Sequence, residues 1–205
     1  MADDIPYDKH FSLPHATVEQ TTDLVRRIVC ANPGPFTFTG TVSYVVGRGK
    51  VAIIDPGPDE PAHIQALLDA VRGETVTHIF VTHTHKDHSP AARAISLATG
   101  GKIVGCGPHT AARPLHIGEV NKLDYAADMD YRPDQQLFDG DVITGPGWNL
   151  EAVETPGHTA NHVAFALREE ATLFSADHVM AWATSIVAPP DGAMSDYMAS
   201  LTKVG

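Results

Sequence analysis

A run of six residues, HTHKDH at positions 83–88, constrains this chain more than any other feature. It follows directly on the apolar run Val76–Thr82 and precedes the helical stretch Ala91–Thr99, which Ser89-Pro90 opens. The order of strand, polar loop and helix is typical of an open α/β sheet, in which functional side chains gather where strands end. Imidazole and carboxylate groups are common metal ligands. The run therefore predicts a metal site at the end of a buried strand.

The spacing within this run divides its ligand-type residues into two groups. Residues two apart in an extended segment point to the same side, so His83 and His85 can share one metal ion. Asp87 and His88 follow after the chain turns and can face another metal ion. One loop can thus supply half of a two-metal site.

Two later segments place further ligand types at strand ends. The sequence TPGHT at 155–159 follows the apolar run Leu150–Glu154, and Gly157 permits the turn that carries His158. The sequence FSADH at 174–178 ends another apolar run with Asp177. Each segment alone is more typical of a turn or a structural residue. In this order, and together with the first run, they indicate a metal centre.

The remaining chain is expected to alternate between strands and helices. Residues 1–22 are polar and interrupted by Pro6 and Pro14, which predicts an irregular arm with at most one short edge strand before a domain over 23–205. Apolar patterning predicts strands at 24–31, 36–46, 50–54, 76–82, 102–105, 142–143, 150–154, 162–167 and 172–175, and helices at 59–72, 91–99 and 195–203. Asp59 is the expected N-cap of the first helix and Gly73 its terminator. Residues 107–136 show little periodicity, so we expect a long loop that covers the site.

Composition narrows the functional classes. With 14 basic and 25 acidic residues the net charge is −11, which weighs against a surface built for nucleic acid. Among the 205 residues there is no apolar run near the roughly 20 that a membrane helix needs, and the N-terminus is acidic. Cys30 and Cys106 are expected to be buried free thiols. These features predict a cytoplasmic protein without a membrane partner.

The three motifs together resemble the metallo-β-lactamase superfamily. This resemblance covers about residues 24–205 and implies an αββα sandwich of mixed α/β class, with helices outside two sheets. It also implies the ligands, which are His83, His85 and His158 for the first metal, Asp87 and His88 for the second, and Asp177 as a bridge between them. Asp55, at a strand end, matches a family aspartate that supports ligands through hydrogen bonds.

Finer details are similar to the beta-lactamase-like protein 2 branch, near the glyoxalase-II-like hydrolases. They are the TPGHTxxH segment, which ends at His162, and the helical sequence DYMxSL that begins at Asp196. The chain departs from the family pattern because the final histidine, expected beyond this helix, does not occur before Gly205, and His178 stands too early. We therefore expect an N-terminal part of a longer protein, incomplete at its C-terminal end. Ser89-Pro90 also stands where many relatives have Gly-Gly.

The resemblance implies a zinc-dependent hydrolase with up to two Zn²⁺ ions, iron or manganese being alternative metals. A metal-bound hydroxide, oriented by Asp87 or Asp177 as catalytic residues, would attack an ester, thioester, lactone or lactam. Alternatives are an endoribonuclease-type phosphodiester hydrolase, a mononuclear-iron sulfur dioxygenase that uses His83, His158 and Asp177, and a non-catalytic metal-binding fragment. A small-molecule substrate is the expected partner, RNA is the alternative, and an oligomer is compatible with the sequence.

The other histidines form no recognisable pattern. A structural or solvated role is expected for His10, His15, His63, His78, His109 and His116. His162 and His178 stand beside predicted ligands, and both hydrogen bonding to those ligands and simple packing remain open for them.

Overall fold

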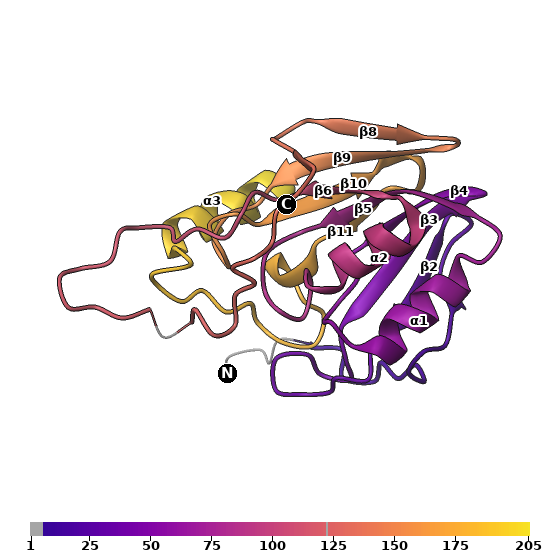
Figure 1. Ribbon diagram of the computed structural model, residues 1–205. Helices are drawn as coiled ribbons and strands as arrows, with labels where there is room; N and C mark the ends of the chain where they lie inside the picture. Colours follow the sequence, from indigo (N-terminus) through magenta and orange to yellow (C-terminus); the bar gives the residue numbers. More distant parts are fainter. Residues whose placement is uncertain (1–5, 122) are drawn as a thin grey trace.

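The computed structural model describes residues 6–121 and 123–205, and within them two β-sheets lie face to face (Figure 1). The larger sheet consists of β1 (Glu19–Gln20), β2 (Val25–Val29), β3 (Val42–Arg48), β4 (Lys50–Ile54), β5 (Thr75–Val81), β6 (Lys102–Gly105) and β7 (Gln135–Gln136), in that spatial order. Strands β1 to β4 pair antiparallel, whereas β4 to β7 pair parallel.

The smaller sheet is antiparallel, in the order β11-β10-β9-β8. Its strands are β8 (Val142–Gly145), β9 (Trp148–Glu154), β10 (Val163–Leu167) and β11 (Thr172–Phe174), and the 3₁₀ turns η1 (Arg168–Glu170) and η2 (Ala176–His178) flank β11. Helices α1 (Pro61–Ala70) and α2 (Ala91–Thr99) cover the outer face of the larger sheet, and α3 (Met194–Val204) lies on the side of the smaller sheet (Figure 1). The expected αββα sandwich is thereby confirmed.

Aromatic side chains join the two sheets. Phe80 of β5 and Phe165 of β10 are fully buried, and their rings meet edge to face with centroids 4.9 Å apart. Burying one such side chain contributes about 1.5–3 kcal/mol. The indole of Trp148 packs beside Gly47 and donates a hydrogen bond to the carbonyl of Lys50 at 3.0 Å. These contacts fix the smaller sheet against the centre of the larger one.

Most predicted elements occur close to their expected bounds, but the strand predicted over 36–46 is wrong in its first half. β3 begins only at Val42, because the preceding segment turns back on itself through a bridge between Gly34 and Phe38. Gly40 has φ +139°, and a Cβ there would lie 1.9 Å from the carbonyl oxygen of Cys30. This close approach of two backbone segments has no signature in apolar patterning.

The ends of α1 also differ from the prediction. The helix begins at Pro61 with Glu60 at the N-cap position and has no side-chain cap, so Asp59 does not cap it. Proline at the first helical position supplies the helical φ instead. The helix ends at Ala70, and Gly73 follows with φ +84°.

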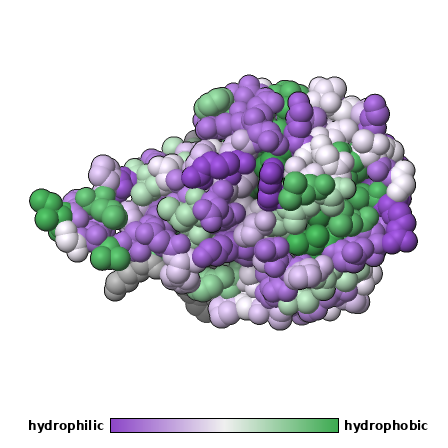
Figure 2. Space-filling model, in the orientation of Figure 1, coloured by the Kyte–Doolittle hydropathy of each residue, from purple (hydrophilic) through white to green (hydrophobic). Residues whose placement is uncertain are grey.

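Residues 107–121 and 123–136 lie mostly in irregular structure, as expected for a long loop, with the two-residue strand β7 at its end. Its outer part carries exposed apolar side chains at Leu115, Ile117 and Val120. Figure 2 shows apolar side chains at the tip of this projecting segment. Both cysteines are buried and free, as predicted. Among the described residues, no helix has the length and apolar character that crossing a bilayer requires.

Candidate metal centre

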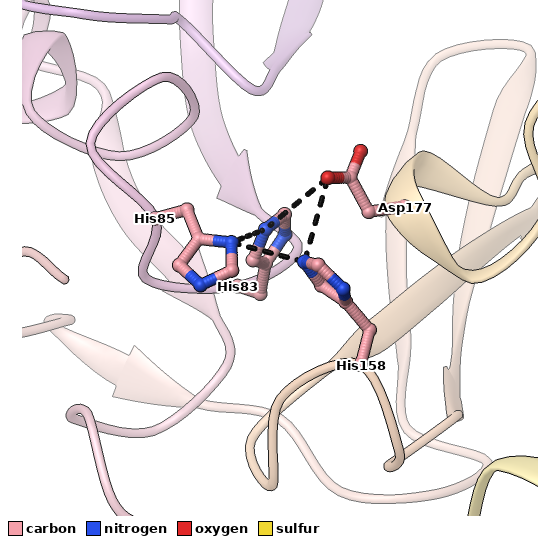
Figure 3. A group of neighbouring side chains, drawn as sticks. All are labelled: His83, His85, His158 and Asp177. Carbon is pink, nitrogen blue, oxygen red and sulfur yellow. Dashed lines mark hydrogen bonds and ion pairs between the residues drawn. The ribbon is translucent and has the colours of Figure 1, made fainter. Parts of the chain in front are cut away.

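Three loops bring four ligand-type side chains to one point (Figure 3). His83 and His85 follow β5, His158 lies in the turn after β9, and Asp177 lies in η2. The Nδ1 atom of His85 is 3.0 Å from Nε2 of His83 and 2.9 Å from Nε2 of His158. Asp177 Oδ2 is 3.4 Å from Nε2 of His158, and one donor atom from each of the four residues lies within 4.8 Å of the others. This donor set fits a divalent metal with bonds of about 2.0–2.2 Å.

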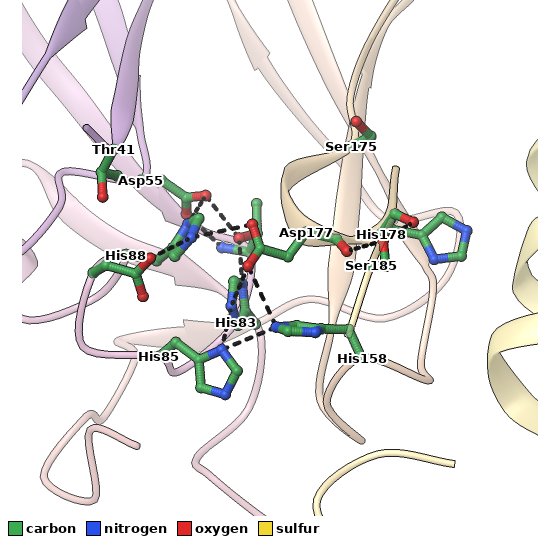
Figure 4. A network of polar contacts seen from close by, with 12 residues as sticks. Thr41, Asp55, His83, His85, His88, His158, Ser175, Asp177, His178 and Ser185 are labelled. Atoms are coloured by element: carbon green, nitrogen blue, oxygen red, sulfur yellow. Dashed lines mark hydrogen bonds and ion pairs between the residues drawn. The ribbon is translucent and has the colours of Figure 1, made fainter. Parts of the chain in front are cut away.

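A second group adjoins the first through the same carboxylate (Figure 4). His88 Nε2 lies 3.5 Å from Asp87 Oδ2 and 3.4 Å from Asp177 Oδ1. The two oxygens of Asp177 thus face different histidines, since Oδ2 faces His158 and Oδ1 faces His88. The structure therefore brings all six sequence-predicted site residues together, and their roles as ligands stay a prediction.

Burial prepares the first group for metal binding. It lowers the pKa of His83 well below the ordinary value, and together with the neighbouring His158 it lowers the pKa of His85 to about 3. Neutral imidazole is the form that coordinates metals. Burial alone would raise the pKa of Asp177, but the adjacent His88 outweighs it and holds that pKa below its usual range. His83 and His85 are therefore uncharged beside the ionised Asp177 at neutral pH, whereas the carboxylates around His88 outweigh its burial and raise its pKa well above the ordinary value.

Hydrogen bonds orient two of the rings. His158 Nδ1 lies 2.6 Å from the carbonyl oxygen of Ile186, so Nδ1–H donates there and the Nε2 lone pair faces the centre. His88 Nδ1 lies 2.8 Å from Asp55 Oδ2, and that carboxylate also accepts hydrogen bonds from the backbone N–H and the hydroxyl of Thr82. Asp55 thus contacts a predicted ligand through hydrogen bonding, as the family pattern implies.

Two residues beside the site have a strained backbone. Asp55 and Ala176 have φ of +47° and +44°, a left-handed conformation that costs a residue other than glycine about 1–3 kcal/mol. The Ser43 hydroxyl donates to the carbonyl oxygen of Asp55, and the Ser185 hydroxyl donates to that of Asp177, both at 2.6 Å. Side-chain hydrogen bonds thus stabilise the segments whose carboxylates enter the site.

Behind Asp55, Ser43 is held in turn by a buried histidine. His63 Nε2 lies 2.8 Å from Ser43 Oγ, and because that hydroxyl donates to Asp55, the imidazole donates to the hydroxyl. Burial lowers the pKa of His63 to about 4. The structural role expected for His63 is thus a specific one, since it supports the strained aspartate.

His63→Gln is expected to reduce the pH dependence of stability. The unfolded chain takes up a proton on His63 near pH 6.5 and the folded chain only near pH 4, so stability falls as the pH decreases through this window. The histidine should account for about 2 kcal/mol of the loss between pH 7 and pH 5. Urea unfolding at pH 7 and pH 5 measures the free energy of unfolding of each variant, with exposed His116→Gln as the control. Equal losses in His63→Gln and the wild type would contradict this role.

The turn before His158 requires glycine. Gly157 has φ +143°, and a Cβ there would lie 2.4 Å from the Cα atom of Tyr197 in α3. Gly157→Ala should destabilise the protein by about 3 kcal/mol or more, since backbone strain and overpacking add. Gly140→Ala is the control, because Gly140 has φ +82° with open space around its Cβ position, and about 1 kcal/mol is expected there. Thermal unfolding compares the two, and equal losses would show that contact with α3 is unimportant.

An open, largely apolar cavity of about 700 Å³ adjoins the donor group. His85, His158 and Asp177 form part of its wall. The apolar wall includes Phe36, Leu123, Tyr125, Met180, Trp182 and Ile186. These residues lie in loops without periodicity, so their spacing in the sequence does not predict a shared cavity.

The remaining histidines are placed differently from one another. His162 stacks on His83 with ring centroids 5.1 Å apart, and its Nδ1 lies 2.8 Å from the Thr155 hydroxyl, so it packs against a predicted ligand. The ring of His178 points away from the donor group, toward Tyr197 of α3 (Figure 4). His109, expected to be structural or solvated, lies 3.7 Å from the buried Asp191.

The family model of the metallo-beta-lactamase superfamily matches residues 36–204. The chain belongs to this superfamily. It is 32% identical over 200 residues to a beta-lactamase-like protein 2 homolog of Caenorhabditis elegans, a match that covers 94% of the chain and 61% of that relative. The resemblance to this branch is thereby confirmed.

Other relatives have been named for an activity. An atrochrysone carboxyl ACP thioesterase of Pseudocercospora fijiensis is 32% identical over 189 residues, covering 90% of the chain and 49% of that relative. The chain thus spans about half to three fifths of the length of these two relatives. A solved beta-lactamase domain protein of Burkholderia ambifaria superposes with a TM-score of 0.71 at 20% identity, covering 97% of the chain and 68% of that structure. This superposition supports the fold.

Proposed function

We propose that this protein is a metal-dependent hydrolase of thioesters with an apolar acyl group. One observation carries the proposal, namely that an apolar cavity of about 700 Å³ shares a wall with the convergent histidines and Asp177. A ligand pocket of this kind binds an apolar body and leaves a few polar groups to orient the reacting bond. The thioesterase name of the P. fijiensis relative supports the same class of bond.

The donor atoms suit zinc, with iron or manganese as alternatives. His83, His85, His158 and Asp177 would hold the first ion, and Asp87, His88 and the other oxygen of Asp177 would contribute to the second. Nitrogen-rich, partly buried coordination favours zinc at the first position. When bound, such ions lower the pKa of water to about 7 and polarise the scissile carbonyl.

The chain's own residues then orient the reactants. Asp87 and Asp177 offer carboxylate oxygens that accept hydrogen bonds from an attacking water and hold it in place. Trp182, which stacks on Phe38 with ring centroids 5.3 Å apart, gives the acyl group a rigid apolar surface. The sulfur of a thioester leaves as a thiolate, which needs little help from a general acid because a thiol has a pKa of about 8.5.

Trp182→Ala is expected to weaken binding of long acyl groups more than short ones. The indole belongs to the cavity wall, so its removal should raise KM for an octanoyl thioester by about tenfold, equivalent to about 1.4 kcal/mol. For an acetyl thioester KM should change little, since a short chain does not reach the indole. Phe138→Ala, at an exposed aromatic residue outside the cavity, is the control. An equal change in KM for both substrates would exclude this role.

A substrate panel tests the function itself. Zinc-loaded and iron-loaded protein are each offered acyl thioesters, lactones, a β-lactam, single-stranded RNA, and a persulfide with oxygen. We expect zinc-dependent thioester hydrolysis to exceed turnover of the other substrates. Faster RNA cleavage would favour the endoribonuclease alternative, iron-dependent oxygen consumption would favour the dioxygenase, and full metal loading without turnover would favour a binding role. Each of these three outcomes would overturn the proposal.

A further inference from the structure

A third group of ligand-type side chains shares no residue with the proposed hydrolytic ligands. His109, Asp124 and Asp191 each present one donor atom, and these atoms lie within 4.8 Å of one another. The three residues come from distant parts of the chain, two in the long loop and one in the segment that leads into α3. Asp191 also lines the apolar cavity, whose wall includes Leu123 from the long loop and Ile186 from the later segment.

Two atoms in this group are buried without a hydrogen-bond partner among the described residues. They are Nε2 of His109 and Oδ2 of Asp191, whose side chains are 4% and 1% exposed. Within residues 6–121 and 123–205, His109 is the ion-pair partner of Asp191, and the 3.7 Å between Nε2 and Oδ1 is too long for a hydrogen bond. An ionised carboxylate buried in this way is costly unless a positive charge accompanies it.

Neighbouring side chains hold the group in place. The Nδ2 amide of Asn121 donates to Oδ1 of Asp124 and to Oδ1 of Asp191, at 2.6 Å each. On the other side, Nδ1 of His109 lies 2.9 Å from the Thr84 hydroxyl, which leaves Nε2 directed toward the carboxylates. The carboxylates of Asp124 and Asp191, which this one amide holds together, repel each other unless a cation lies near them. The arrangement is thus preorganised for positive charge.

We propose that His109, Asp124 and Asp191 bind one divalent transition-metal cation at a site separate from the hydrolytic ligands. Its donors are one imidazole nitrogen and two carboxylate oxygens, a set that suits Mn²⁺ or Zn²⁺. Because the cation joins the long loop to the segment before α3, it stabilises two walls of the apolar cavity. Its binding does not depend on hydrolysis.

Metal counting tests the site without using activity. The variant His83→Ala/His85→Ala/Asp177→Ala lacks donors at both proposed hydrolytic positions, so the metal that it retains should belong to His109, Asp124 and Asp191. Titrated with Mn²⁺, it should bind one equivalent and unfold at a higher temperature. Adding Asp191→Asn, or His109→Gln where the asparagine variant fails to fold, should raise the Kd for Mn²⁺ at least tenfold and remove the thermal shift. His116→Gln, in the same loop, is the matched control and should change neither.

The contrary results are equally definite. Mn²⁺ binding and a thermal shift that survive both Asp191→Asn and His109→Gln would place the cation elsewhere. Binding of no metal by His83→Ala/His85→Ala/Asp177→Ala, with a folded protein confirmed by circular dichroism, would leave Asp191 and His109 as an ion pair alone. Either result overturns the proposal. Calorimetry with Zn²⁺ in place of Mn²⁺ provides the second measurement, with the same expected loss in the variants.

Discussion

Replacing His85 with alanine is expected to abolish metal binding at the first position and with it nearly all hydrolysis. Nδ1 of His85 lies 3.0 Å from Nε2 of His83 and 2.9 Å from Nε2 of His158. Its loss therefore removes the donor at the middle of the group. A catalytic metal contributes several kcal/mol to the transition state, so turnover should fall by about 10³-fold or more. Mass spectrometry of the metal content and a thioester assay measure the two effects.

The control for this variant is His116→Ala, at an exposed histidine outside the site. It should retain both metal and turnover. Full metal content in His85→Ala would mean that the convergence of the three imidazoles has no role in metal binding.

Asp177→Asn should preserve the fold and lose most turnover. The two side chains are nearly isosteric, but an amide offers one oxygen where the carboxylate offers two, and in this structure those oxygens face His158 and His88. We expect a folded protein that binds its second metal ion at least tenfold more weakly and whose kcat falls by about 10²-fold or more. Circular dichroism, zinc titration and kcat are compared in the same preparation.

Asp130→Asn serves as the matched control, because Asp130 is an exposed carboxylate in the long loop. Its zinc stoichiometry and kcat should equal those of the wild type. Unchanged turnover in Asp177→Asn would show that this carboxylate acts only as a turn former.

The positions of the six clustered residues could be predicted because they follow regular elements. His83 and His85 come directly after a parallel strand, and apolar patterning locates the end of that strand within a residue. Asp177 follows the short strand β11 in the same way. Because β5 lies in the larger sheet and β9 and β11 in the smaller one, it was the resemblance to the superfamily that predicted that these strand ends meet at one site.

The cavity and the group of His109, Asp124 and Asp191 could not be predicted, because their residues lie in loops. Asp191 stands 82 residues after His109, and neither segment has a period from which a direction could be derived. The turn at Gly40 and the support of Asp55 by His63 likewise depend on contacts between distant segments. A sequence shows which residues are able to make such contacts, whereas packing decides which of them do.

Anomalous X-ray diffraction from crystals grown with zinc tests the central claim most directly. We predict a zinc peak within about 2.0–2.2 Å of Nε2 of His83, Nδ1 of His85, Nε2 of His158 and one oxygen of Asp177, as zinc ligation requires. Absence of zinc from this point in zinc-loaded protein, or a zinc ion held by other side chains only, would contradict the account.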